Sequence, residues 1–87
     1  MIKANLTFNY LHAPEPIVTY GGKGKTVFDA LSNIPLTWRE IKLKGTIEVT
    51  DRKRKALKMF YAKQLRILFA NPGRRQGWAR QFEILLR

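Results

Sequence analysis

The most prominent chemical feature of the sequence is a run of cationic side chains in its second half. The run consists of Arg52, Lys53, Arg54, Lys55, Lys58, Lys63 and Arg66. Lysine and arginine bind phosphate through charge-assisted hydrogen bonds, and contact with a nucleic-acid backbone releases condensed counterions. Because cations held on one side of a rigid element would reach several phosphates, we expect nucleic-acid binding that weakens steeply as the salt concentration rises.

The same basic run admits other interpretations. An exposed row of charges can serve solubility alone. A basic amphipathic helix can also lie on an anionic membrane surface or fit an acidic groove of a partner protein. Phosphate binding is favoured because few acidic residues are available to pair with these cations: residues 51–87 contain eleven basic and two acidic side chains.

A second candidate contact lies in residues 72–78, where an Asn-Pro-Gly breaker predicts an exposed loop. Its candidate side chains are Arg74, Arg75 and Trp78. Arginine makes bidentate contacts with phosphate or guanine, and tryptophan stacks on unpaired bases. Trp78 also shares a helical face with Phe82 and Leu85, and this spacing favours a packing role for its ring.

A glycine-rich segment, residues 21–26, carries Lys23 and Lys25 between an expected strand and an expected helix. It ends in Gly-Lys-Thr, as a P-loop does, but the first glycine of that motif would fall at position 19, which is threonine. We therefore expect no nucleotide hydrolysis. Free N–H groups at the start of the helix, together with the two lysines, could hold one backbone phosphate.

Residues 21–27 also fit the spacing Gly-x-x-Gly-x-x-Val. This pattern is similar to the G-x-x-G loop of KH domains, which clamps a nucleic-acid backbone. In that family the loop is entered from a helix, whereas residues 16–20 have no helical pattern. A solvated turn between strand and helix is the simpler interpretation of the segment.

The sequence offers little for catalysis. His12 is the only histidine and precedes a proline-rich stretch, and the six carboxylates are scattered singly, without an acid–base pair. Because the chain has no cysteine, thiolate metal sites and disulfides are excluded. No other cluster has metal-ligand spacing. We therefore expect a protein that is not an enzyme and needs no cofactor.

Composition and charge set the broad class. The chain has 87 residues, 45% of them apolar, which suffices for one small core, so we expect a single domain over residues 1–87. The formal net charge of +11 divides into +2 over residues 1–50 and +9 over residues 51–87. This asymmetry predicts a polyanionic partner. Unbroken apolar runs reach only four residues, so no membrane span is expected. Because the chain has no cysteine, an intracellular location is the simpler expectation: cytoplasm, nucleoid or, left open, an organelle matrix.

Periodicity predicts the elements in the first half of the chain. Apolar residues alternate over residues 2–10 and again over residues 39–50, which indicates two strands with one buried face each. Residues 17–20 are β-prone and predict a short edge strand. Thr26 is placed to cap a helix over residues 27–33.

In the second half, Thr50 or Asp51 would cap a long amphipathic helix that ends near Ala70. The apolar face of this helix is expected to comprise Ala56, Leu57, Phe60, Tyr61, Gln64, Leu65, Ile67 and Leu68. The final segment fits either a short helix or a strand, and its helix-forming residues favour the helix. The fold class is therefore α+β: a small antiparallel sheet of about three strands, packed against a long basic C-terminal helix and a short terminal helix.

These patterns favour a non-catalytic nucleic-acid-binding protein, a ribonucleoprotein component or small DNA-binding accessory protein, with DNA or RNA undecided. It would contact phosphates through the helix over residues 51–70 and the loop over residues 72–78. A second hypothesis is a small basic modulator or inhibitor, for example phage-encoded, that binds a nucleic-acid-processing enzyme. The two differ at high salt, because a protein interface retains an apolar hot spot while backbone contacts fade.

Overall fold

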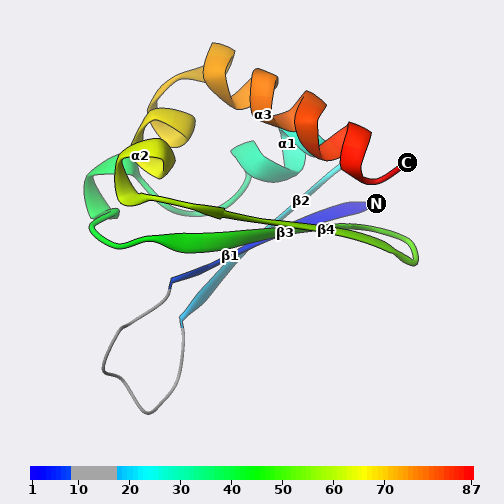
Figure 1. The fold of residues 1–87 in the computed structure, drawn as a ribbon, viewed down its shortest axis with the longest axis horizontal. Coiled ribbons are helices and arrows are strands. Elements are labelled where there is room, and N and C mark those ends of the chain that lie inside the picture. The colour runs from blue at the N-terminus through cyan, green and yellow to red at the C-terminus, as the bar shows by residue number, and fades with distance from the viewer. Residues whose placement is uncertain (9–17) are drawn as a thin grey trace.

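The computed structural model describes residues 1–8 and 18–87, and in these residues an antiparallel sheet carries helices on one of its faces (Figure 1). The elements in chain order are β1 (Ile2–Phe8), β2 (Thr19–Gly24), α1 (Val27–Ser32), the 3-10 turn η1 (Trp38–Glu40), β3 (Gly45–Asp51), β4 (Arg54–Phe60), α2 (Ala62–Ala70) and α3 (Pro72–Leu85). The four strands lie in the order β2-β1-β3-β4. The α+β class is confirmed, and the sheet has one strand more than expected.

The central strand β1 follows from its alternating sequence. Ala4, Leu6 and Phe8 are buried beneath the helices, while the residues between them lie on the opposite, open face of the sheet. Leu6 pairs with Tyr20 of β2 on one side and with Ile47 of β3 on the other. The expected strand extended to residue 10. Residues 9 and 10, like His12, lie outside the described residues.

The glycine-rich segment is a strand and not a loop, which corrects the prediction. Residues 19–24 form β2, an edge strand as expected for this region, and pair with β1. Glycine is needed here because α1 lies directly on the strand: a Cβ at Gly22 would stand 2.2 Å from the carbonyl oxygen of Ala30. A Cβ at Gly24 would stand 2.7 Å from the backbone nitrogen of Ala30. The glycines therefore allow a close approach of helix and strand.

Gly22→Ala is expected to lower the free energy of unfolding by about 1–3 kcal/mol, because α1 must move away from β2 to admit the methyl group. Urea denaturation followed by circular dichroism measures this loss. Gly77→Ala is the matched control, since no atom lies within 4 Å of a Cβ built there. Equal stability of the two variants would contradict the close packing of α1 on β2.

The helix α1 matches its expected start. The Thr26 hydroxyl accepts a hydrogen bond from the Asp29 backbone N–H at 3.1 Å, as a helix N-cap does. The strand expected over residues 39–50 is shorter than predicted and begins at Gly45. Before it, η1 begins after Thr37, whose backbone N–H donates to the Glu40 carboxylate at 3.4 Å. Ile41 is buried as expected although it lies outside the strand.

The helix expected over residues 51–70 covers only the second half of that range. Residues 54–60 form β4, which pairs with β3 along its whole length, and residues 62–70 form α2. Arg52 and Lys53 make the two-residue turn between the strands. Phe60 and Leu65 are buried as predicted, whereas Leu57 and Tyr61 are 58% and 64% exposed. Pairing with β3 decides the conformation, because tertiary context outweighs local propensity.

The breaker at residues 71–73 ends one helix and starts the next. The predicted loop 72–78 is therefore wrong: its residues are the first turns of α3. The Asn71 side-chain oxygen accepts a hydrogen bond from the Arg74 backbone N–H at 3.1 Å, and Pro72 stands in the first turn, where its missing N–H is not needed. The helical interpretation of the final segment is confirmed, but α3 is the longest helix described and not a short one.

The core fills the space between the sheet and the helices (Figure 1). At the end of β4 the Phe60 ring is fully buried, with its centroid 4.9 Å from the Trp78 ring and 6.2 Å from the Phe82 ring. These contacts fix α3 above the edge strand. No helix among the described residues is long and apolar enough to cross a membrane.

Candidate nucleic-acid interface

The four consecutive cations gather at the tip of the β3–β4 hairpin and not along a helix. Arg52 and Lys53 form the turn, and Arg54 and Lys55 begin β4; all four are exposed. Arg54 donates a hydrogen bond from Nη1 to the carbonyl oxygen of Leu86 at 3.1 Å, which ties the hairpin to the end of the chain. A shallow depression of about 570 Å³ lies here, lined by Asp51, Arg52, Lys53, Arg54, Leu86 and Arg87.

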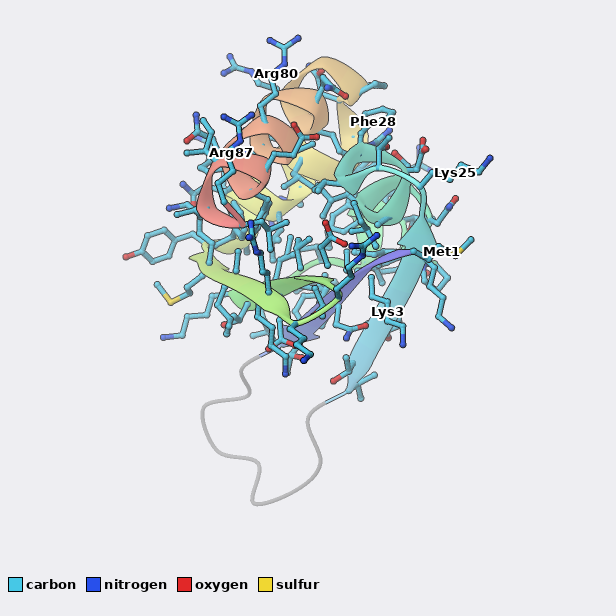
Figure 2. All side chains as sticks on the ribbon, turned by 90° about the vertical axis from the view of Figure 1, so that its right-hand side faces the viewer. Met1, Lys3, Lys25, Phe28, Arg80 and Arg87 are labelled. Carbon is cyan, nitrogen blue, oxygen red and sulfur yellow. The ribbon has the colours of Figure 1, made fainter. Side chains whose placement is uncertain are left out.

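Arg87 joins this cluster although the sequence analysis did not single it out. Nothing local in the sequence marks it, since only the folding of α3 back over β4 brings it to the hairpin. Arg80, also missed, is exposed on α3. Figure 2 shows Arg80 projecting from α3 and Arg87 lying beyond its end, on the side away from Lys25.

Arg52 holds a backbone conformation that favours glycine. Its φ is 59°, the only positive φ of a non-glycine residue among those described. Two-residue hairpin turns of type II′ have a positive φ at this first position and prefer glycine there. An arginine at this position costs stability, on the order of 1–2 kcal/mol.

Arg52→Gly is expected to raise the free energy of unfolding by about 1 kcal/mol by removing this strain. Thermal denaturation and urea denaturation both measure the gain. Lys53→Gly, at the adjacent turn position without a positive φ, should instead be neutral or destabilising. Loss of stability in Arg52→Gly would contradict the turn geometry.

A groove between β4 and α3 contains the second group of candidate residues. It has a volume of about 610 Å³ and is lined by Lys58, Gly73, Arg74, Gly77, Trp78 and Gln81. The Lys58 ammonium lies over the Trp78 ring, 5.2 Å from its centroid. Trp78 is half-buried, with its ring perpendicular to Phe60. The packing role that spacing favoured for Trp78 is therefore confirmed, and part of the ring still faces the groove.

Arg66 and Arg75 have structural partners that the sequence analysis did not foresee. Arg66 donates from Nη1 to the carbonyl oxygen of Ile41 at 3.2 Å and so joins α2 to the segment before β3. Arg75 donates from Nη1 to the last carbonyls of α2, at 3.4 Å to Leu68 and 3.0 Å to Phe69. Both guanidinium groups are part-buried, so they are not free to bind phosphate as exposed cations are.

Arg75→Met is expected to lower the free energy of unfolding by about 1–3 kcal/mol, because the carbonyls at the end of α2 lose their charged donor. Methionine retains much of the apolar contact that the Arg75 side chain makes over the Phe28 ring. Urea denaturation measures the loss, with exposed Arg74→Met as the matched control. If the control were the more destabilised variant, the capping role of Arg75 would be wrong.

The remaining predicted cations lie apart from these groups. Lys63 is exposed on α2. Lys23 lies on the open face of β2, and Lys25 follows that strand. Because β2 and β4 are opposite edges of the sheet, the structure does not bring Lys23 and Lys25 together with the hairpin tip.

The open face of the sheet has a different character. Its positions are Lys3, Asn5, Thr7, Thr19, Gly21, Lys23, Thr46, Glu48, Thr50, Lys55, Leu57 and Met59. None of these described positions is aromatic. The Thr7 and Thr19 hydroxyls are hydrogen-bonded at 3.1 Å, and Glu48 places a carboxylate in the middle of the face. This face is therefore less suited to a phosphate backbone than the side formed by β4 and α3.

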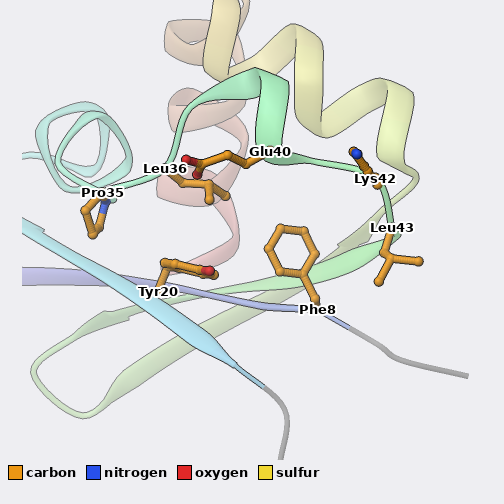
Figure 3. Close-up of a pocket in the computed structure, with 7 residues that line it drawn as sticks. All are labelled: Phe8, Tyr20, Pro35, Leu36, Glu40, Lys42 and Leu43. Atoms are coloured by element: carbon orange, nitrogen blue, oxygen red, sulfur yellow. The ribbon is translucent and has the colours of Figure 1, made fainter. Parts of the chain in front are cut away.

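A third depression lies on the helix side of the sheet, at the end of β1 (Figure 3). It has a volume of about 490 Å³ and is lined by Phe8, Tyr20, Pro35, Leu36, Glu40, Lys42 and Leu43. The rings of Phe8 and Tyr20 meet edge to face, with centroids 6.0 Å apart. Its one carboxylate and one ammonium balance in charge, so it adds nothing to the basic surface.

Comparisons with protein-family models, with curated proteins and with solved structures found no match to this chain. Within residues 1–8 and 18–87, no group of three or more His, Cys, Asp or Glu side chains is placed to hold a metal ion. The functional argument therefore depends on the surface chemistry of the basic residues.

Proposed function

We propose that this chain is a non-catalytic nucleic-acid-binding protein that contacts phosphates through one side of the molecule. We name this surface the basic side and define it as Arg52, Lys53, Arg54, Lys58, Arg74 and Arg87. It replaces the basic helix and arginine-rich loop expected from the sequence. An intracellular location, where nucleic acids are available, belongs to the same proposal.

The observation that carries the proposal is the continuity of these cations. Arg54 and Lys58 both lie on the helix side of β4, where they alternate with the buried residues Ala56 and Phe60. The strand spacing places these two residues about 13 Å apart. Arg54 therefore belongs to the hairpin cluster, and Lys58 lines the groove. Asp51 is the one acidic residue that lines either depression. A row of this kind suits a repeating polyanion.

The strained turn supports the same proposal. A glycine in place of Arg52 would fold more easily, yet the position carries an exposed cation in the turn of the hairpin. Strain of this kind indicates that the side chain serves a purpose other than stability. Phosphate contact is the role that a guanidinium performs best at such a site.

A salt titration tests the proposal. Binding to labelled duplex DNA, single-stranded DNA and structured RNA is measured by fluorescence anisotropy between low and physiological salt. We expect the logarithm of the affinity to fall linearly with the logarithm of the salt concentration, by about 0.7–0.9 for each phosphate contacted. Absence of binding to all three polymers at low salt would overturn the proposal.

A second candidate function is supported by a separate observation. Leu57 and Met59 are exposed apolar residues on the open side of the edge strand β4, where Lys55 precedes them, and the exposed Tyr61 follows the end of the strand. Apolar side chains with a cationic neighbour are typical of a protein interface, with the apolar part as its hot spot. The chain would then act as a modulator of a nucleic-acid-processing enzyme with an acidic surface.

Salt dependence separates the two functions. Capture of such an enzyme that persists at high salt, and is lost in Leu57→Ser with Met59→Ser, would favour the modulator. These positions are exposed, so the double variant should fold. Capture that disappears with salt and is indifferent to these substitutions would favour direct nucleic-acid binding.

A further inference from the structure

We propose that the groove between β4 and α3 binds one unpaired nucleotide, with its base against the Trp78 ring and its flanking phosphates on Lys58 and Arg74. This inference rests on the proposed function and narrows it to single-stranded nucleic acid, DNA or RNA. It assigns a base-contacting role to the groove, whereas the hairpin tip contacts only the backbone.

The first support is the fixed orientation of an aromatic ring among cations. Trp78 is half-buried and stands perpendicular to Phe60, at 4.9 Å between ring centroids, so the core holds the indole in place. Single-strand-binding surfaces combine cations along the backbone with aromatic rings on which bases stack. Trp78 is the one aromatic residue among those that line the hairpin depression and this groove, so its ring is the stacking surface on the basic side.

The second support is the room beside the ring. A Cβ built at Gly77 meets no atom within 4 Å, so no packing contact explains glycine in the second turn of α3. Glycine weakens a helix interior, and alanine would fit here. Because Gly77 has no side chain, one wall of the groove is open beside Trp78. That opening admits a flat group to the surface of the helix.

The third support is the charge of the groove. Its lining includes Lys58 and Arg74 but no carboxylate. The Lys58 ammonium now lies over the Trp78 ring, 5.2 Å from its centroid. On binding, this flexible side chain moves to a phosphate and leaves the ring to the base. The Gln81 side chain, with both a donor and an acceptor, lies in the groove where it can meet a base edge.

These features favour an unpaired strand over a duplex. The bases of a duplex are stacked on one another, and their faces are closed to a side chain in a recess. A duplex would therefore meet only the cations of the basic side. A single strand offers the face of a base as well, and stacking is tolerant of sequence because every base has such a face.

The test uses the two tryptophans of the chain separately. In Trp38→Phe, Trp78 is the only tryptophan, and its fluorescence reports on the groove. We expect oligothymidylate and oligouridylate of equal length to quench this emission, with the same midpoint as the anisotropy of the labelled oligonucleotide. A duplex of that length should bind without comparable quenching. In Trp78→Phe the remaining Trp38, exposed in η1, should not be quenched.

A second variant tests the open wall without altering charge or the core. Gly77→Gln places a side chain in the groove and should weaken single-strand binding about tenfold, the effect of losing one stacked base, while duplex binding is unchanged. Ile84→Gln, exposed on the same helix outside the groove lining, is the control and should bind as the parent does.

The outcomes separate the two proposals. Binding of single strands without quenching of Trp78, or with full affinity in Gly77→Gln, would overturn the base site and leave the basic side as a backbone contact. Equal quenching by duplex and single strand would also overturn the preference for unpaired nucleotides. Failure of every polymer to bind at low salt would overturn the proposed function itself.

Discussion

Phe60→Ala is expected to lower the free energy of unfolding by about 3–5 kcal/mol, a large share of the stability of a domain of this size. The ring is fully buried at the end of β4 and contacts both Trp78 and Phe82 of α3. Its removal leaves a cavity between the sheet and the helix, and the two aromatic partners lose their contact. Urea denaturation followed by circular dichroism measures the effect.

Leu57→Ala is the matched control, since Leu57 lies on the same strand with its side chain 58% exposed. We expect this variant to lose well under 1 kcal/mol, because surface substitutions change stability little. The pair also tests the conformation of residues 54–60. A helix would bury Leu57 and Phe60 on one face, so comparable losses in the two variants would contradict β4.

The second large effect concerns binding. Replacing Arg52, Lys53 and Arg87 together by glutamine should weaken nucleic-acid binding by on the order of ten- to a hundredfold at low salt and reduce the salt slope by about 2. Arg54 is retained because it donates a hydrogen bond to Leu86. The three replaced side chains are exposed, so the fold should persist. Anisotropy titrations at several salt concentrations measure both quantities.

The control variant removes an equal number of positive charges, three, from positions outside the basic side. Lys3, Lys25 and Lys42 are exposed lysines outside the basic side, and their replacement by glutamine should change the salt slope by much less. Equal losses in the two triple variants would mean that net charge, and not the placement of cations at the hairpin, governs binding.

The sequence predicted correctly those elements whose residue pattern fits only one type of secondary structure. The alternation of residues 2–10 indicated β1, and Thr26 marked the start of α1. The spacing of apolar residues in residues 54–60 fits both a helix and a strand. Ala56 and Phe60 are four residues apart, which places them on one face of a helix and also on one face of a strand. Leu57 and Tyr61 fit only the helical face, and both are exposed.

The β3–β4 hairpin was also not predicted because its turn has an unusual sequence. The residues between β3 and β4 are Arg52 and Lys53, so the Asn-Gly or Gly-containing signature of a two-residue turn is absent. The glycines of residues 21–24, in contrast, gave a turn signal where the structure has a strand. They predicted a loop, yet they serve the contact of β2 with α1, which depends on residues distant in space and not on the segment itself.

For the candidate site, the sequence predicted which types of residue are involved but not how they are grouped in space. The excess of cations after residue 51 was evident from composition, and Arg52, Lys58, Arg74 and Trp78 were all among the candidates. Their grouping depends on the fold, because α3 must lie over β4 before Arg74 and Lys58 can line one groove. Arg66 and Arg75 could not be set aside from sequence, since their carbonyl partners are defined only by the packing of α2.

The order of the strands has a consequence for how the chain folds. The centre of the sheet joins β1 to β3, pairing residues as distant in sequence as Leu6 and Ile47, and α1 contacts α3 near the other end of the chain. During synthesis β1, β2 and α1 are made first, but a two-stranded hairpin with one short helix is marginal in water. The last helix supplies Phe82 and the aromatic contacts of Phe60. Folding therefore waits for α3 and is slowed by the long loops that must close.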